Sequence, residues 1–237
     1  MLIIACGDSY TLGEGLDSPN QVYSYILAKK LKAEYKNYAQ SGASEYLILN
    51  QIEQAVKLKP DLIIIGHTNE YRWKVWDFRR KHWQGFIVAN HVLKNEKYYR
   101  NWILSEQILG NIRKHEKQHQ AAWHAAGMLY FSDEKIVQEL WEGAVAKQII
   151  LCNNAKIKHI HLSCFPHLYP NLCSLTDLTI PLHFDSMKHK DFAPDGSHAG
   201  TKSHLRVAKE LYDFLELRKY FGENLGIFRS QPQAHKS

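Results

Sequence analysis

The clearest pattern in the chain is a pair of short apolar runs that each end at a glycine. Leu2 to Cys6 are all apolar and precede Gly7, and Leu62 to Ile65 precede Gly66 in the same way. Uninterrupted apolar runs of this length are typical of parallel strands that are buried on both faces. We therefore predict buried strands at Leu2–Cys6 and Leu62–Gly66.

Helical patterns fill the sequence between these two strands. Apolar residues recur at helical spacing over Val22–Ala33 and over Ser44–Leu58, and a short strand at Tyr35–Ala39 separates the two helices. We expect the second helix to bury a face that consists of Tyr46, Leu47, Leu49, Ile52 and Val56. Strands that alternate with helices in this way predict βαβ units and a parallel sheet.

The alternation breaks after Glu70 and resumes near residue 134. The intervening segment is rich in aromatic and basic residues, and we expect parts of it to be helical, notably Tyr98–Ala126. Beyond it the pattern predicts helices at Glu134–Ala155 and Lys202–Tyr220, a strand at Ile157–Phe165 and a short fifth strand within 177–192. We therefore predict one α/β domain over 1–220 with an insertion at about 70–133, followed by a polar C-terminal tail at 221–237.

Composition narrows the class of protein. The chain has 237 residues, of which 45% are hydrophobic, so it can bury a core in one domain. No apolar run approaches the roughly 18 residues that span a bilayer, and we expect no signal peptide before the first strand. The net charge of +6 is spread along the chain without a nucleic-acid motif. The four cysteines lack CxxC spacing and indicate buried, reduced thiols. We expect a cytoplasmic protein without nucleic-acid or membrane partners.

Polar residues suited to acyl transfer follow the predicted strands. Ser9, Gly42 and Asn69 each lie in a loop that follows a predicted strand. Asp195 and His198 lie three residues apart in the loop just before the last helix. Such loops converge at the carboxyl edge of a parallel sheet. A histidine base can activate a serine hydroxyl, and an aspartate can fix the tautomer of that histidine. The amides of Ser9 and Gly42 and the Asn69 side chain are suitable oxyanion donors.

Each of these residues also has a structural interpretation. Ser9 can cap the helix that follows it, Gly42 can serve a turn, and Asn69 can bond within its own loop. Asp195-Gly196-Ser197 is ordinary turn and helix-cap sequence. All these interpretations together require a coincidence at separate places in the chain, so we favour catalysis.

The segments GDSYTLGEG, AQSGAS, GHTNE and PDGSHAG resemble, in order, the four motif blocks of the SGNH (GDSL-type) hydrolases. The resemblance spans residues 2 to about 216 apart from the insertion. It implies a flavodoxin-like three-layer α/β/α sandwich with a five-stranded parallel sheet in the order 2-1-3-4-5. It also implies Ser9 as nucleophile with Asp195 and His198, an oxyanion hole of Ser9, Gly42 and Asn69, and no cofactor. The third block departs from its usual Gly-x-Asn-Asp form, because Glu70 follows Asn69.

A competing motif lies in the insertion. His115-Glu116-Lys117-Gln118-His119 matches the HExxH pattern of zinc peptidases. Its neighbours are basic and polar, whereas a zinc site needs a dry pocket with supporting hydrogen bonds. With 14 histidines in the chain, a chance match is unsurprising. We predict no metal site.

The insertion begins directly after Asn69, so we expect it beside the site. Trp73 and Trp76 are candidate substrate-binding residues, because exposed indole rings stack on sugars or hold acyl chains. They can equally belong to a private core of the insertion. The sequence therefore predicts a serine ester hydrolase for a small-molecule or carbohydrate ester, with O-acetyl groups on a carbohydrate as the favoured substrate. An acyl-thioesterase, an acyltransferase, a binding or structural protein and a zinc peptidase are the alternatives.

Overall fold

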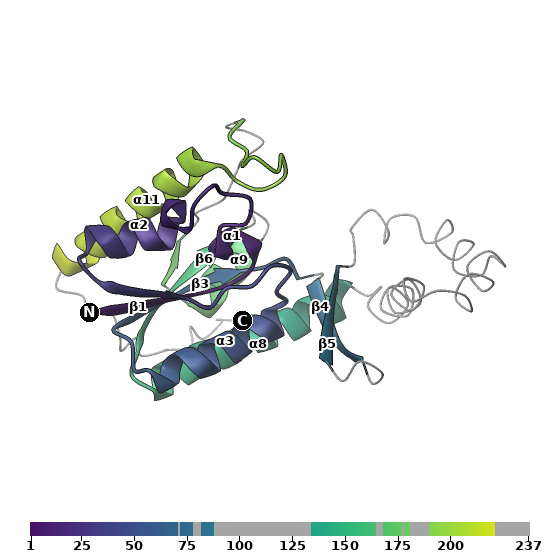
Figure 1. The fold of residues 1–237 in the computed structure, drawn as a ribbon. Coiled ribbons are helices and arrows are strands. Elements are labelled where there is room, and N and C mark those ends of the chain that lie inside the picture. The colour runs from purple at the N-terminus through teal and green to yellow at the C-terminus, as the bar shows by residue number, and fades with distance from the viewer. Residues whose placement is uncertain are drawn as a thin grey trace.

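A five-stranded parallel sheet forms the centre of the computed structural model (Figure 1). The structure describes residues 1–70, 72–77, 82–87, 134–164, 168–176, 178–180 and 190–220. Its strand order is β2-β1-β3-β6-β7, which confirms the predicted order 2-1-3-4-5. The strands are β1 (Leu2–Cys6), β2 (Glu34–Asn37), β3 (Leu62–His67), β6 (Lys158–Ser163) and β7 (Thr179–Ile180).

Helices cover both faces of this sheet, which gives the predicted three layers. The helices are α1 (Ser9–Leu12), α2 (Tyr23–Lys30), α3 (Glu45–Lys57), α8 (Glu134–Asn154), α9 (Tyr169–Leu175) and α11 (Thr201–Tyr220), with a 3-10 turn, η1, at Pro19–Gln21. The pair α2 and α11 packs on one face, and the pair α3 and α8 packs on the other (Figure 1).

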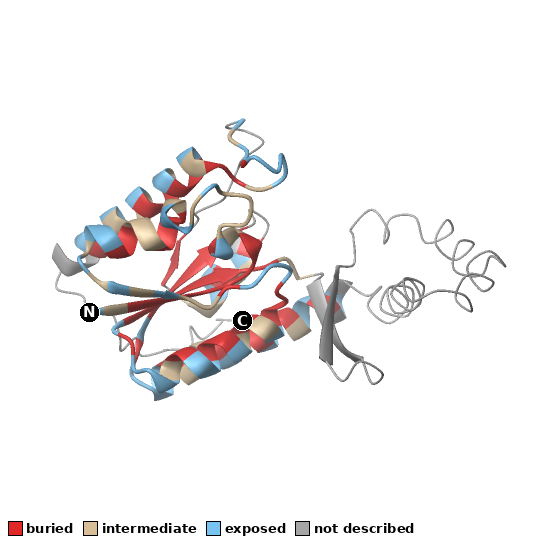
Figure 2. Ribbon diagram, viewed as in Figure 1, coloured by how far each residue is buried: buried red, intermediate tan, exposed pale blue. Residues whose placement is uncertain are grey.

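Each face of the sheet has its own apolar core (Figure 2). Ile64 and Ile160 pack against Leu27 of α2 on one face. Ile63 and Ile65 pack against α3 and α8 on the other. Neighbouring residues of a strand point to opposite faces, so one apolar run supplies both cores. Strands β1 and β3 are therefore almost entirely buried, as their composition predicts, whereas the edge strand β2 is partly exposed.

The buried face of α3 differs from the predicted one. Tyr46 is exposed, whereas Glu45 and Gln51 are buried on the side that faces the sheet. Gln51 binds the backbone of Gly7: Gly7 N–H donates to Gln51 Oε1 at 2.7 Å, and Gln51 Nε2 donates to Gly7 O at 3.1 Å. Partners 44 residues away allow a polar side chain to occupy a core position, which the local pattern does not reveal.

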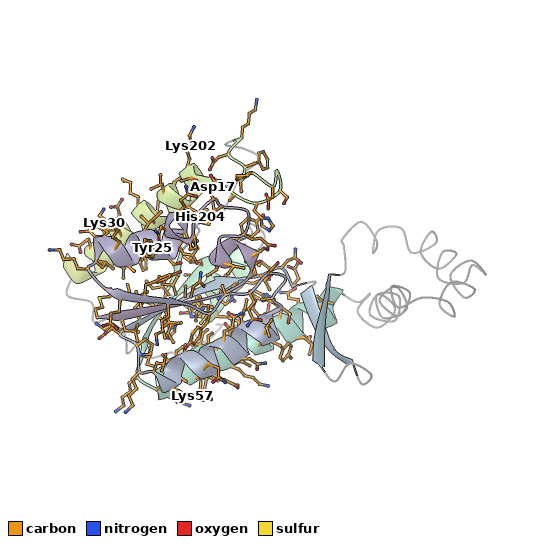
Figure 3. The ribbon with its side chains drawn as sticks, viewed as in Figure 1. Asp17, Tyr25, Lys30, Lys57, Lys202 and His204 are labelled. Carbon is orange, nitrogen blue, oxygen red and sulfur yellow. The ribbon has the colours of Figure 1, made fainter. Side chains whose placement is uncertain are left out.

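The helix pair α2 and α11 is joined by polar contacts as well as apolar ones. Figure 3 shows His204 on α11 beside α2, where the Tyr23 N–H donates to His204 Nδ1 at 3.3 Å. Burial lowers the pKa of His204 to about 4. His204 is thus a neutral core residue near neutral pH. A second polar contact joins the same two helices, because Lys30 of α2 places its ammonium 3.5 Å from the ring centroid of Tyr212 on α11.

The insertion begins with a β-hairpin, which the sequence pattern does not predict. Strands β4 (Arg72–Asp77) and β5 (His82–Ile87) pair antiparallel, and β4 contacts α3. Trp73 and Trp76 both lie in β4, where the register pairs Trp76 with Trp83. The helix expected at Tyr98–Ala126 and the tail at 221–237 lie outside the described residues.

The cysteines correct one expectation. Cys6, Cys152 and Cys164 are buried free thiols, as predicted, but Cys173 is exposed on α9. Burial raises the pKa of Cys152 to about 12. Among the described residues, no helix is long and apolar enough to cross a membrane.

Candidate active site

Ser9 begins the short helix α1 directly after β1. Asp8 caps this helix by accepting a hydrogen bond from Tyr10 N at 3.0 Å on Oδ1. Gly13 ends the helix in a left-handed conformation with φ of 81°. Strand, cap and glycine together fix Ser9 at the carboxyl edge of the sheet, which is where open α/β folds bind ligands.

Asp195 and His198 form a hydrogen-bonded pair in the loop before α11. Asp195 Oδ2 lies 2.6 Å from His198 Nδ1, and Asp195 Oδ1 accepts from the backbone N–H groups of His198 at 3.0 Å and Ser197 at 2.9 Å. These two backbone donors, followed by the His198 ring, hold the pKa of Asp195 well below its usual range. The ionised carboxylate favours the His198 tautomer that carries its proton on Nδ1, so Nε2 is left to accept a proton.

The other side of the His198 ring meets the loop that follows α1. Glu14 Oε2 lies 3.7 Å from His198 Nε2, and the Tyr10 ring contacts the His198 ring edge-on at 5.8 Å between centroids. Gly15 packs against Asp195 so closely that a Cβ would overlap the carboxylate, and its φ of 82° also favours glycine. The Ser9-bearing segment therefore supports both members of the pair. Among the described residues, no hydrogen bond joins Ser9 to His198, a contact that often tightens only when substrate binds.

Two neighbouring loops are fastened to the Ser9 loop. Gln40 N donates to Gly7 O at 3.1 Å, and Thr68 Oγ1 donates to Asp8 Oδ2 at 3.0 Å. Gly42 lies two residues after Gln40 and is exposed, with φ of 66° and open space where a Cβ would lie. Asn69 follows Thr68 directly. The two candidate oxyanion donors thus sit on loops anchored beside the serine.

Sequence reasoning missed several residues that build this edge. They are Glu14, Glu45, Gln51, His67 and Thr68. Glu14 and His67 lie inside the motif segments GDSYTLGEG and GHTNE, so their position was a usable signal. Glu45 and Gln51 gave no local signal, because they read as the polar face of an ordinary helix.

The described residues also bear on metal binding. Among them, no group of three or more His, Cys, Asp or Glu side chains is arranged to hold a metal ion. His159 and His161 are buried in β6 and hydrogen-bonded to each other at 2.8 Å. The HExxH segment His115–His119 lies outside the described residues.

Comparison with solved structures found similar folds at low sequence identity. TesA shares 13% identity with a TM-score of 0.53, over 92% of this chain and 99% of its own. A carbohydrate esterase family 2 enzyme from Corynascus thermopiles (Myceliophthora fergusii), which carries a carbohydrate-binding domain, shares 12% identity with a TM-score of 0.53, over 93% of this chain and 66% of its own. A two-domain esterase active on acetylated mannans shares 13% identity with a TM-score of 0.51, over 99% of this chain and 53% of its own.

Sequence comparison adds no closer relative. No protein-family model matches the chain, and a search of curated proteins found no match. Identities of 12% to 13% carry information about the fold alone. The parallel sheet in the order β2-β1-β3-β6-β7, with helices on both faces, agrees with those folds. The chain therefore has the fold of the SGNH (GDSL-type) hydrolases.

Proposed function

We propose that this chain is a serine ester hydrolase with Ser9 as nucleophile, His198 as base and Asp195 as the residue that orients His198. One observation carries the proposal. The Asp195–His198 pair, 2.6 Å apart, packs against the same segment that holds Ser9 at the sheet edge. Solved structures of the same fold are esterases, which is consistent with this chemistry.

The proposed reaction has two steps. Ser9 Oγ attacks the ester carbonyl while its proton passes to His198 Nε2. The ester C–O bond then breaks as His198 returns that proton to the leaving alcohol, and the acyl group stays on Ser9. Water repeats the sequence and releases the acid. The amides of Ser9 and Gly42 and the Asn69 side chain stabilise the tetrahedral oxyanion in both steps.

Hydrolysis of p-nitrophenyl acetate by the full chain tests this proposal. We expect activity that resists a chelator, is lost in Ser9→Ala and is retained in Ser174→Ala. Ser174 is a matched control, because its hydroxyl bonds the Asn171 carbonyl within α9. Activity that survives Ser9→Ala but not the chelator would point to a zinc peptidase on His115 and His119. Faster turnover of thioesters would point to an acyl-thioesterase, and transfer of the acyl group to an added alcohol would point to an acyltransferase. A complete lack of turnover favours a binding or structural protein.

For the substrate we propose O-acetyl groups on a carbohydrate, with Trp73 and Trp76 in contact with the sugar. The support is that β4, which contains both tryptophans, begins shortly after Asn69 and pairs Trp76 with Trp83 of β5. Aromatic side chains between charged residues suit a sugar better than a long acyl chain. We expect acetate release from acetylated glycans to exceed hydrolysis of C8 and longer esters. A marked preference for long chains would contradict this assignment.

A further inference from the structure

A row of polar side chains crosses the layer between the sheet and the helices α3 and α8. His67 ends β3, and His159 and His161 lie in β6, all at strand positions that face this layer. Neighbouring strand residues of the layer, such as Ile63 and Ile65, are apolar. All three histidines are buried. Three buried imidazole rings would destabilise the fold unless their nitrogen atoms form hydrogen bonds.

The row is continuous from the protein surface to the edge that holds Ser9. Asn153, exposed at the end of α8, places Oδ1 3.1 Å from His159 Nε2. His159 Nδ1 lies 2.8 Å from His161 Nε2, and His161 Nδ1 lies 2.7 Å from His67 Nε2. His67 Nδ1 then lies 2.7 Å from Glu45 Oε1. Both ring nitrogens of every histidine are therefore engaged.

Proton counting relates the directions of these contacts to one another. Each contact between two ring nitrogens needs one N–H and one lone pair. If Glu45 accepts from His67 Nδ1–H, each neutral ring must donate through Nδ1 and accept through Nε2, so the row must end on a donor. The Asn153 amide supplies that donor when its NH2 faces His159, because the two ends of an amide have the same shape. Burial lowers the pKa of His159 to about 4, which keeps this ring neutral at pH 7.

Glu45, at the inner end of the row, also fixes the loop after β3. Its Oε2 accepts from Thr68 N at 3.2 Å, and its Oε1 accepts from Gln148 Nε2 at 2.8 Å. Thr68 is held at two further atoms: Trp141 Nε1 donates to Thr68 O at 3.1 Å, and Thr68 Oγ1 donates to Asp8. Three donors thus converge on the Glu45 carboxylate, a group that only accepts hydrogen bonds when ionised.

Both candidate oxyanion donors lie next to these contacts. Gly42 precedes Glu45 by three residues, and Asn69 follows Thr68 directly. We propose that Glu45, supported by the histidine row, is a positioning residue that fixes the separation of Gly42 and Asn69. The inference rests on the proposed function, in which these two residues stabilise the oxyanion, and it explains why a buried carboxylate ties the two loops together.

Glu45→Gln is the informative substitution, because it keeps the volume and replaces an acceptor with NH2. If that NH2 faces Thr68 N, two donors oppose each other and the loop with Asn69 must move. If it faces His67 and Gln148, the tautomers of the whole row must reverse and Gln148 must turn. Glu53→Gln is the matched control, since Glu53 is an exposed glutamate on the same helix.

The experiment measures kcat and KM for p-nitrophenyl acetate together with backbone amide NMR shifts of Gly42, Thr68 and Asn69. We expect Glu45→Gln to lower kcat by about 10²-fold, since a displacement of about 1 Å at a catalytic group costs that much. We also expect KM within about twofold, shifts at all three amides and no change in Glu53→Gln. An unchanged kcat with unmoved Gly42 and Asn69 signals, or an effect confined to KM, would overturn the proposal.

Two further outcomes of the experiment must be distinguished: a variant that does not fold and a wild-type chain without esterase activity. If Glu45→Gln does not fold, Gln148→Met removes one of the three donors at similar volume, and we expect a smaller change in the same direction; its absence would contradict the proposal. If the wild-type chain hydrolyses no ester, the proposed function fails. The NMR shifts in the same variants still show whether Glu45 positions the two loops.

Discussion

The molecule contains two histidine–carboxylate pairs of nearly equal length in opposite surroundings. His198 Nδ1 lies 2.6 Å from Asp195 with side chains 23% and 32% exposed, whereas His67 Nδ1 lies 2.7 Å from Glu45 with side chains 0% and 4% exposed. In the exposed pair, Nε2 of His198 makes no hydrogen bond within the described part of the chain, with Glu14 Oε2 at 3.7 Å, so it is available for the proposed proton transfer. In the buried pair, every ring nitrogen is already engaged. The contact distance alone therefore does not distinguish the pair proposed for catalysis from the pair proposed for positioning. The other contacts of each pair do.

The largest expected effects fall on the exposed pair. Ser9→Ala and His198→Ala should each lower kcat by about 10⁴- to 10⁶-fold, because a nucleophile and its base act as one unit. Asp195→Ala should retain more activity, since a free imidazole still samples the required tautomer. The Ser9→Ala, His198→Ala double variant should be scarcely worse than either single one. Steady-state kinetics on all four variants tests this expectation. If the loss of kcat in the double variant equals the product of the two single losses, Ser9 and His198 do not act together.

Asn69→Ala tests the donor that the buried pair is proposed to position. We expect kcat to fall by about 10²- to 10³-fold, the usual cost of one oxyanion-hole donor. KM should stay nearly unchanged, because the donor acts mostly on the transition state. Kinetics with p-nitrophenyl acetate distinguishes the two parameters. If Asn69→Ala mainly raised KM, Asn69 would be a substrate-binding residue instead.

Acid should destabilise the fold through its buried histidines. Burial lowers the pKa of His159 to about 4, below the value of about 6.5 in the unfolded chain, so the unfolded state binds more protons between these pH values. The free energy of unfolding should therefore fall as pH drops from 6.5 to 4, by about 2 kcal/mol at pH 5 from this histidine. Urea unfolding at several pH values measures it. His159→Gln should show a shallower dependence, and an unchanged slope would contradict this origin.

The smallest effect is expected at Glu14. Its carboxylate lies 3.7 Å from His198 Nε2, but its side chain is 37% exposed. Glu14 can pair with His198 only when the ring is protonated, and partly exposed ion pairs are worth about 0–1 kcal/mol, so Glu14→Gln should change kcat by less than about fivefold. The same change at buried Glu45 should cost far more, and parallel kinetics compares the two. A loss at Glu14 as large as that of His198→Ala would mean that Glu14 holds the catalytic ring.

The sequence predicted the parts of the molecule that depend on local pattern. The apolar runs of β1 and β3 indicated buried strands, and the three-residue spacing of Asp195 and His198 indicated their pairing. The buried face of α3 was mispredicted, because Glu45 and Gln51 find partners 22 and 44 residues away. The β4–β5 hairpin was missed, because its aromatic and charged residues follow neither a strict strand period nor a helical one.

The histidine row shows the same limit of local reasoning. His159 and His161 alternate with Ile160 and Leu162, so the sequence places them on one face of β6. Their partner His67 lies 94 residues from His161 and is reached only through the pairing of β3 with β6. A hydrogen-bonded row across two strands therefore becomes visible only once the fold is known.

The central claim is that Ser9 is a nucleophile activated by the exposed pair, and covalent labelling tests it most directly. The full chain is treated with a fluorophosphonate, and intact and peptide masses locate the adduct. We expect one adduct per chain, on Ser9, absent in Ser9→Ala and formed at least about 10³-fold more slowly in His198→Ala. An adduct on another residue, or labelling of Ser9 that His198→Ala leaves unchanged, would contradict the claim.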